Sequence, residues 1–441
     1  MMDFGMRFAG WWSAAAVYRD KRVIAITFLG ISSGFPLGIL GDPLTAWLQE
    51  SGLSKTSIGL FALVGLPYAL KFLWAPAFDQ FCIPLVTDAF GRRRGWIIVS
   101  QIALLVCVLS LGFIELPGDI FLAAAVTLGV AFTSASQDIV IDAYRVEILE
   151  ERQLGAGAAT VVFGYRLGQV GAGAAGLIVA SIFGWSAAFM AMGAVAVIGI
   201  LAILLNPEPK HDLSILVEET IIGGLRTSVV APLADFFARP GWPLIIGVIV
   251  FYKLGDSVLS VMQTPFFLEL EFTKPEIAGI KKGVGLAAII AGGFLGGAMV
   301  AGLGILKSLF VCGILQALSN LVFVYQALAG HDLTVLTITV AAENLATGMG
   351  STAFVAYLSS LCNQSYTATQ YALLTSVMGG ARTVLSASAG WFADHMGWIS
   401  FFVLTTVAAL PALLFIWLLM RHCPIQQCEG KKTVHAPNKS N

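Results

Sequence analysis

Charge is scarce in this sequence. Only 12% of the 441 residues are Asp, Glu, Lys or Arg, roughly half the share of a soluble globular protein. Hydrophobic residues make up 57%, and the 47 glycines are typical of membrane helices that pack closely. The composition predicts an integral membrane protein with little room for a soluble domain. The formal net charge of −1 says nothing about partners, and we expect no nucleic acid among them.

The sequence also lacks the signatures of other classes. Its six cysteines form no disulfide framework, and Cys423 and Cys428 lack the second ligand pair that a metal site would need. Neither the phosphate-binding pattern GxxxxGKS/T nor the zinc pattern HExxH occurs, and no histidine falls in the middle of an apolar run. We therefore expect neither an enzyme nor an ATP-driven pump, and no metal or other cofactor.

One glycine pattern imitates a nucleotide site. Gly171, Gly173 and Gly176 spell GxGxxG, but no strand precedes them and they lie inside an apolar run. Close packing of helices is the better explanation. The same explanation applies to the pairs Gly164/Gly168 and Gly292/Gly296.

About a dozen apolar runs are long enough to cross a membrane, which takes about 20 residues. They lie near 23–48, 56–77, 95–115, 119–143, 155–182, 185–205, 242–268, 276–303, 305–329, 333–361, 368–392 and 398–420. A polar stretch in the middle, where an amphipathic helix could lie on the membrane, separates two groups of six. The expected parts are a cytoplasmic N-terminus at 1–22, a six-helix bundle at 23–206, a cytoplasmic linker at 207–241, a second six-helix bundle at 242–420 and a cytoplasmic tail at 421–441.

Basic residues gather on one side of the expected helices. With the N-terminus inside, the outer loops hold only Lys55, Lys274 and, at the start of a helix, Lys281 and Lys282. The inner segments hold 17 of the 25 Lys and Arg residues. This asymmetry predicts that both termini are cytoplasmic. No small-residue cleavage site follows the basic N-terminal stretch, so we expect no signal peptide to be removed.

The two groups of helices repeat a pattern. The first group reads Gln153, Arg166 and then AGLIVASIFGW, and the second reads Gln370, Arg382 and then AGWFADHMGW. Both patterns span the fifth and sixth helices of their group. Two parallel six-helix repeats are the architecture of the major facilitators. We therefore expect an all-α membrane protein of twelve transmembrane helices, with a substrate site between the halves near the midplane.

Ionisable residues inside the apolar runs mark candidate functional positions, because a charge inside a membrane is costly. They are Asp42, Lys71, Asp138, Asp142, Arg166, Lys253, Asp256, Glu343 and Arg382. Ser134, Asp138 and Asp142 lie four residues apart and form one stripe on a helix. Asp138 lies roughly 6 Å deeper than Asp142, and Arg166 on the next helix is a plausible partner for it.

Most of these charges also have a structural interpretation. Asp142, near the inner surface, is open either to solvation or to a contact with Arg145. Lys253 and Asp256 lie three residues apart and can neutralise each other. Glu343 has no cation within helical reach, which favours a protonatable role. Carboxylates inside the helices favour protons as the driving ion. Asp42, between a glycine and a proline, is suited to cap a broken helix.

Six stretches of the sequence resemble the AmpG family of anhydromuropeptide permeases. They are KFLWAPAFDQ…GRRRGW (71–96), SASQDIVIDAY (134–144), GAGAA…GYRLG (155–168), YKLGD (252–256), ENLATGMGSTAFVAYLSSLCN (343–363) and TATQYALL (367–374). The resemblance implies a twelve-helix major facilitator, monomeric and in the bacterial inner membrane. It would import GlcNAc-1,6-anhydro-MurNAc and its peptides from periplasm to cytoplasm. The proton motive force would drive import, which serves peptidoglycan recycling and the linked induction of β-lactamase.

The first of these stretches also resembles the inner-gate motif of the facilitators, Gly-x3-Asp-Arg-x-Gly-x-Arg-Arg. Asp79 takes the acidic place and 91–94 the basic run, with an insertion between them; Ala75 replaces the usual glycine and Gln80 the usual basic residue. We expect the gate to consist of Asp79, Arg92, Arg93, Asp142 and Arg145.

The implied substrate is a polar disaccharide with peptide carboxylates. Amide side chains can bond sugar hydroxyls, and cations can bond carboxylates. We expect the substrate to contact Gln137, Asp138, Arg166, Lys253, Asn344 and Arg382, and protons to be coupled by Asp138, Asp256 and Glu343. Tyr165, Tyr252 and Tyr357 could stack on sugar faces, although packing explains each of them more simply.

Two alternatives remain open. A major facilitator of the same fold could carry another polar solute, such as acetyl-CoA, a siderophore or a drug. A membrane sensor or membrane-embedded transferase would place a catalytic carboxylate in a large outer loop, and the outer loops here are short.

Overall fold

The computed structural model describes residues 17–53, 61–209, 232–386 and 388–422. All regular elements in these ranges are helices. Those of the N half, residues 17–209, are η1 (Val17–Arg19), α2 (Lys21–Leu40), α3 (Asp42–Glu50), η2 (Phe61–Gly65), α5 (Leu66–Leu70), η3 (Lys71–Leu73), α6 (Ala75–Gln80), α7 (Val86–Phe90), α8 (Arg92–Leu111), α9 (Ile120–Ile148), η4 (Glu151–Gln153) and α10 (Leu154–Leu204).

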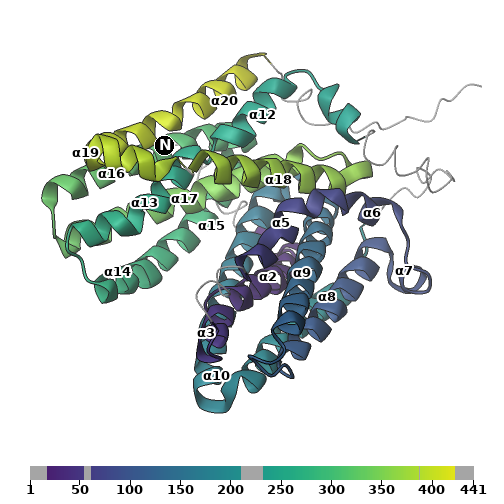
Figure 1. The fold of residues 1–441 in the computed structure, drawn as a ribbon. Helices are drawn as coiled ribbons and strands as arrows, with labels where there is room; N and C mark the ends of the chain where they lie inside the picture. Colours follow the sequence, from purple (N-terminus) through teal and green to yellow (C-terminus); the bar gives the residue numbers. More distant parts are fainter. Residues whose placement is uncertain (1–16, 54–60, 210–231, 387, 423–441) are drawn as a thin grey trace, which may run out of the picture.

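The C half, residues 232–422, opens with a helical turn at 232–237. Its elements are α12 (Trp242–Phe251), α13 (Leu254–Glu269), α14 (Lys274–Ile280), η6 (Lys281–Gly285), α15 (Leu286–Leu303), α16 (Ile305–Ala329), α17 (Leu333–Ser360), η7 (Gln364–Tyr366), α18 (Thr367–Ser386), α19 (Ala389–Ala408) and α20 (Leu410–His422). The helices of each half lie together as one bundle (Figure 1). The two bundles meet where α10 packs against α15 and α17, and where α18 lies beside α5 and α9.

Eight helical segments among the described residues are long and apolar enough to cross a membrane. Two of them, Glu151–Leu204 and Ala389–Arg421, are interrupted by a glycine with positive φ. The total of twelve spans therefore stays a prediction. Of the expected linker, 210–231 lies outside the described residues, and so do Lys55 and the tail beyond 422.

The two interruptions confirm the sequence repeat. Gly184 has φ 84° and ψ 170°, and Gly397 has φ 69° and ψ 162°. Each precedes a tryptophan, Trp185 or Trp398. Glycine reaches this region of backbone space without the steric cost that a Cβ would add. The same tight corner thus interrupts α10 and α19 at matching places in the two halves.

The first expected helix is also broken, as predicted. α2 ends at Leu40, and α3 starts at Asp42 after Gly41. Asp42 is the first residue of α3 and makes no side-chain cap bond, so the capping role expected for it is wrong. The second expected helix is a chain of short pieces, η2, α5, η3 and α6, with prolines at the starts of α5 and α6. A proline at a first turn lacks only a donor that is unbonded anyway.

Glycines let helices touch backbone to backbone. A Cβ on Gly168 of α10 would lie 2.2 Å from the Ile31 carbonyl oxygen of α2, and one on Gly292 of α15 would lie 2.1 Å from the Leu345 oxygen of α17. The packing role expected for these pairs is confirmed. It is also confirmed for Gly173, whose amide nitrogen would lie 3.1 Å from a Cβ on Gly38 of α2, and for Gly176, whose own Cβ would lie 2.5 Å from the Met192 sulfur. It is wrong for Gly171, whose Cβ would meet nothing within 4 Å.

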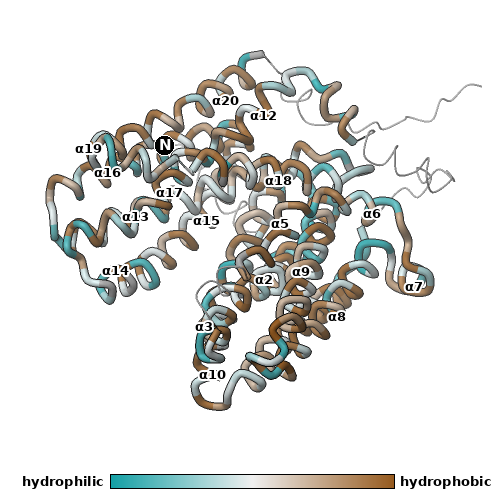
Figure 2. Tube along the Cα trace, in the orientation of Figure 1, coloured by the Kyte–Doolittle hydropathy of each residue, from teal (hydrophilic) through white to brown (hydrophobic). Residues whose placement is uncertain are grey.

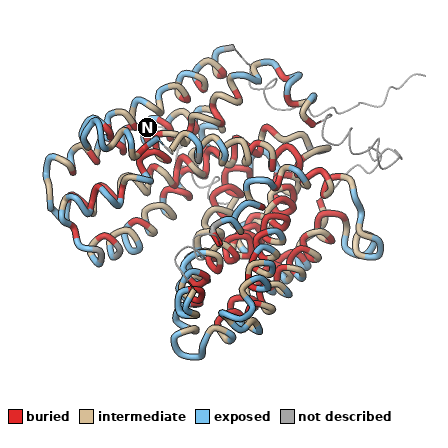
Figure 3. Tube along the Cα trace, viewed as in Figure 1, coloured by how far each residue is buried: buried red, intermediate tan, exposed pale blue. Residues whose placement is uncertain are grey.

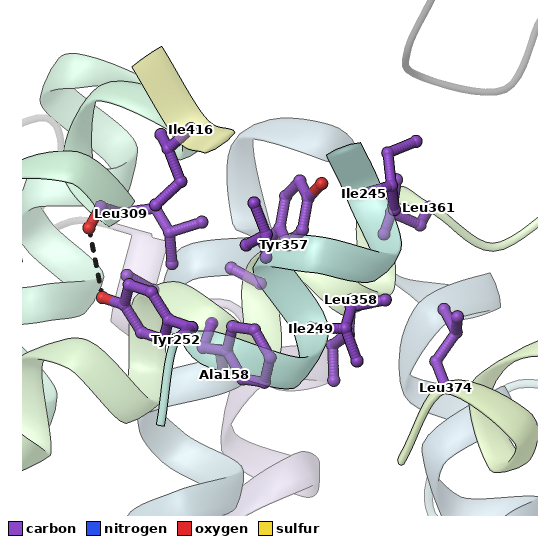
Figure 4. Close-up of a cluster of buried hydrophobic side chains, with 14 of the residues drawn as sticks. Ala158, Ile245, Ile249, Tyr252, Leu309, Tyr357, Leu358, Leu361, Leu374 and Ile416 are labelled. Carbon is purple, nitrogen blue, oxygen red and sulfur yellow. Dashed lines mark hydrogen bonds between the residues drawn. The ribbon is translucent and has the colours of Figure 1, made fainter. Parts of the chain in front are cut away.

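Two of the tyrosines considered for stacking on sugar are buried in the core of the C half. Tyr252 stacks on Phe354 with ring centroids 5.0 Å apart, and its hydroxyl donates to the Leu309 carbonyl 3.1 Å away (Figure 4). Tyr357 belongs to the same buried cluster. Packing is therefore the correct interpretation for both.

Apolar side chains also cover the outside of the bundles. Hydrophilic residues gather towards helix ends and connections (Figure 2), whereas buried residues lie along the helix faces turned inward (Figure 3). Phe121, Leu122, Ile178 and Phe183 are more than half exposed. Such outward apolar faces are suited to lipid, where only helices with internally bonded backbones are stable.

Candidate functional site

A cavity of about 770 Å³ lies between the two halves. The N half contributes residues of α2, α3 and α10 to its wall, and the C half contributes residues of α13, η6, α15, α17 and α18. This volume is in the range of sites that enclose a small ligand. The position between two helical repeats is where a facilitator binds its substrate.

Charged side chains from both halves line this cavity. Five are cationic and three are acidic: Arg166, Lys253, Lys281, Lys282 and Arg382, against Asp42, Asp256 and Glu343. Four of the six residues expected to bind substrate are among the lining residues, namely Arg166, Lys253, Asn344 and Arg382. An excess of two positive charges favours an anionic ligand.

The acidic groups of the C half form one hydrogen-bonded network. Lys253 Nζ lies 3.2 Å from Asp256 Oδ2, which confirms the expected pair, and Gln316 also donates to this carboxylate. The Thr347 hydroxyl is 3.4 Å from Asp256 Oδ2 and 3.3 Å from Glu343 Oε1. A hydroxyl has one proton to donate and cannot satisfy two carboxylates at once. A proton on one of the two carboxyls would complete the network.

Glu343 has no ion-pair partner within 4.0 Å among the described residues. Its carboxylate accepts from Asn344 Nδ2 at 2.7 Å, and Lys281 and Lys253 act on it at longer range. These lysines lie on other helices, so helical spacing along the sequence could not show them. The contrast with Asp256, which has Lys253, makes Glu343 the carboxyl better placed to hold a proton.

Gln137 and Asp138 do not line this cavity. Gln137 is fully buried and donates to the Ser32 carbonyl at 2.6 Å. Asp138 accepts from the Ser33 hydroxyl at 2.6 Å and interacts electrostatically with Lys71. Arg166 instead donates to Gln169 at 3.2 Å. The expected pairing of Asp138 with Arg166 is thus wrong, because Arg166 lines the cavity whereas Asp138 is bonded to Ser33 away from it.

At one end of the cavity the halves are joined by Asp79 of α6. Its carboxylate accepts from the backbone amides of Ala368 and Thr369 at 3.2 and 2.8 Å, and from the Thr369 hydroxyl at 2.7 Å. These amides belong to the first turn of α18, whose unpaired donors and dipole favour a negative group. Asp79 of the N half therefore caps a helix of the C half.

Arg93 holds Asp79 in place. It is 1% exposed, and its guanidinium contacts Asp79 at 2.7 Å, Glu147 of α9 and the Phe78 carbonyl. Arg92 donates to the backbone carbonyl of Asp79. Two carboxylates on one buried guanidinium satisfy most of its donors.

Glu208 completes this end of the N half. It accepts from the backbone amides of Arg93 and Arg94 at 2.7 and 3.0 Å, at the start of α8. Burial raises the pKa of Glu208, and these two hydrogen bonds oppose the rise.

Arg145 makes a second connection between the halves. This fully buried residue of α9 donates to the Ser359 hydroxyl of α17 at 2.8 Å, and its guanidinium lies 5.2 Å from the Tyr371 ring centre of α18. Asp142 contacts it at 3.2 Å. All five residues expected to form the gate therefore make contacts in this region, and their role as a gate stays a prediction.

The repeat extends to side-chain contacts. Gln153 donates to Asp20 at 2.7 Å, and its counterpart Gln370 donates to Asp235 at 2.8 Å. Arg22 pairs with Asp20, and Arg239 pairs with Asp235. Each half thus fastens the start of its fifth helix to the segment that precedes its first.

Several residues of the site were missed from the sequence. Thr347 lies four residues after Glu343, so helical spacing could have found it. Gln316, Glu147 and Glu208 come from other helices or from a helix end, and no local pattern marked them. The sequence predicts an outer position for Lys281 and Lys282 but not their place in the wall of the cavity.

The fold and the cavity define a transporter of the facilitator class. The chain belongs to the Major Facilitator Superfamily, whose model matches residues 23–379. The proton:xylose symporter XylE shares the fold, with a TM-score of 0.64 and 13% identity over 93% of this chain and 97% of that one. The human organic anion transporter MFSD10 has a TM-score of 0.63 and 14% identity over 90% and 99%.

Within that superfamily the chain is of the AmpG type, as the sequence motifs implied. It is 39% identical to the anhydromuropeptide permease of Escherichia coli K12, over 91% of this chain and 80% of the relative. It is 36% identical to a putative transporter, AmpG 4, of Rickettsia conorii, over 91% and 97%. The protein is therefore a multi-pass membrane protein of a transporter family.

Proposed function

We propose that the protein is a bacterial inner-membrane importer that moves anhydromuropeptides from periplasm to cytoplasm with the proton motive force, for peptidoglycan recycling. The observation that carries the proposal is the cavity between the halves, lined by both cations and carboxylates. The similarity to the E. coli permease supplies the cargo. Both termini lie in the cytoplasm, and the protein works as a monomer without a cofactor or catalytic activity.

The residues divide into three roles. Arg166, Lys253, Asn344 and Arg382 bind the sugar and the carboxylates of the substrate. Gln137 and Asp138 now contact Ser32 and Ser33 of the N half and do not line the cavity. They reach the substrate only when the protein opens to the cytoplasm. Asp79, Arg92, Arg93, Asp142 and Arg145 close the cytoplasmic end. The halves at 23–206 and 242–420 act as the two moving bodies, joined by the linker at 207–241.

Proton coupling centres on Glu343 and Asp256. An ionised carboxylate without an ion pair is costly inside a membrane, so closing the cavity around the substrate favours a neutral Glu343. The protonated Glu343 carboxyl then donates a hydrogen bond to the Thr347 hydroxyl, which donates its own hydrogen bond to Asp256. Opening to the cytoplasm releases substrate and proton together.

Uptake into proteoliposomes tests the cargo and the energy source. Purified protein receives labelled GlcNAc-anhydro-MurNAc-peptide under an inward proton gradient. We expect accumulation that collapses on addition of a protonophore. Accumulation that is unchanged by the protonophore would exclude proton coupling. No uptake by folded, correctly oriented protein would discard the cargo and leave another polar anion, such as acetyl-CoA or a siderophore, as the solute.

A further inference from the structure

Two adjacent lysines stand where basic residues are rare. Lys281 and Lys282 lie at the outer end of their helix in the proposed orientation, whereas most basic residues of the chain lie on the inner side. Charges at the end of a span usually extend into the interface. Both lysines instead line the cavity between the halves.

The local backbone places both side chains there. Residues Lys281–Gly285 form a turn of π-helix, η6, between α14 and α15. A π-turn inserts a residue and shifts the direction of the side chains around it, and such turns are frequent at functional sites. Here the turn lets two consecutive lysines reach the same cavity, which a regular helix, with about 100° between neighbours, disfavours.

The lysines are not used by ion pairs of the fold. Lys281 Nζ is 3.4 Å from the Thr264 hydroxyl and interacts with Glu343 at longer range. Across the described part of the chain, neither lysine nor Arg382 has a carboxylate within 4.0 Å. Asp42 of the N half also lines this cavity, but the cations of the cavity still outnumber its carboxylates.

We propose that the Lys281–Lys282 turn, together with Arg382, forms an anion subsite that receives the peptide carboxylates of the substrate at the mouth of the cavity. Cations that line one cavity can bond separate carboxylates of one ligand, because Lys has three donors and Arg a planar fork. The sugar then lies deeper, towards Asn344. The identity of the ligand at this subsite rests on the proposed cargo. The preference of the subsite for anions does not. It makes the protein select charged muropeptides over neutral ones.

The first test measures charge preference without any cargo. Ser260 is exposed on α13 and lines the same cavity. The reactivity of the thiol in Ser260→Cys therefore reports on the electrostatic potential of the cavity. The modification rates of this cysteine by negatively charged methanethiosulfonate ethylsulfonate and its trimethylammonium analogue are compared by peptide mass spectrometry. Lys281→Gln/Lys282→Gln should lower the anion-to-cation rate ratio by about threefold or more at low salt. Lys307→Gln/Arg152→Gln, which removes the same two charges from exposed side chains outside this cavity, should leave the ratio unchanged.

The second test measures ligand preference. Binding of GlcNAc-anhydro-MurNAc-peptide to purified protein is compared with that of the derivative whose peptide carboxylates are carboxamides. The wild-type protein should prefer the carboxylate form by about tenfold, as expected for a few partly exposed ion pairs. The double lysine variant should bind both forms alike and keep the affinity for the carboxamide.

The outcomes separate the two proposals. A rate ratio that does not depend on the lysines, or a carboxylate preference that survives their removal, overturns the subsite. A lysine-dependent rate ratio with no binding of either muropeptide keeps the subsite and removes the cargo.

Discussion

The N half and the C half share a frame but carry different chemistry. Both have a Gly-Trp corner, a glutamine fastened to an aspartate, and one arginine that lines the cavity. The C half places a network of Lys253, Asp256, Thr347 and Glu343 on the cavity. In the N half, Asp138 is bonded to Ser33 away from it, and the largest charge cluster lies at the closed end around Arg93.

This difference shows how a duplicated bundle divides its work. Features that build helices and corners are repeated, because either half needs them to pack. Two charged clusters have no counterpart in the other half: the network of Asp256 and Glu343 on the cavity, and the cluster around Arg93. The contact expected to form the gate still depends on both halves, since Asp79 of one caps α18 of the other.

The largest effect should come from neutralising Glu343, the carboxyl of the C-half network that has no ion-pair partner among the described residues. Glu343→Gln should abolish accumulation driven by a proton gradient, where one pH unit supports roughly tenfold accumulation per coupled proton. Exchange of labelled for unlabelled substrate should persist, because it needs no net proton movement. Proteoliposome uptake measures both. If Glu343→Gln accumulates substrate as wild type does, the division of work between the halves is wrong.

The second effect concerns the gate of the N half. Arg93→Ala leaves Asp79 and Glu147 buried without their cation, which typically costs about 3–5 kcal/mol. Thermal unfolding of the purified protein should show a marked fall in Tm. Arg152→Ala is the control, because that side chain is 75% exposed and such pairs contribute about 0–1 kcal/mol. Equal shifts for the two variants would contradict the structural role of Arg93.

The paired aspartates give a pH-dependent test of the repeat. Burial opposes ionisation of Asp235, but hydrogen bonds from Arg239 and Gln370 outweigh it and hold its pKa below the usual range. The hydrogen bond from Arg22 likewise lowers the pKa of Asp20. A carboxyl with a lowered folded-state pKa stabilises the protein above its unfolded pKa of about 3.9, and this stabilisation is lost as pH falls through the folded-state pKa.

Asp235→Asn and Asp20→Asn should therefore each lower Tm modestly at neutral pH, and the difference from wild type should shrink in acid. Asparagine keeps the cap that Asp20 provides to α2, since both residues cap helices well. Thermal unfolding across pH measures both variants. A Tm difference that grows in acid, or that occurs in one half alone, would break the equivalence of the two contacts.

The smallest effect tests the separation of Asp138 from the cavity. Because Asp138 bonds Ser33 and Arg166 bonds Gln169, the variants Asp138→Asn and Arg166→Ala should act independently. A double-mutant cycle on Tm and on substrate affinity should give a coupling within about 0.5 kcal/mol of zero. A coupling well above that would restore the direct pair.

The sequence by itself determined the class and frame of this protein. A membrane interior tolerates only apolar helices, so the apolar runs, the Gly-Trp corners and the break before Asp42 were readable from local chemistry. The motif at 71–96 also pointed to Asp79, Arg92 and Arg93, which the structure places in one cluster of contacts.

Only the tertiary structure decided which charges meet. Helical spacing relates residues on one helix, as it did for Lys253 and Asp256, but it does not give the rotation or depth of a neighbouring helix. For that reason Asp138 pairs with Ser33 rather than with Arg166, and Gln316 reaches Asp256. For the same reason two outer lysines line a cavity between halves far apart in the chain.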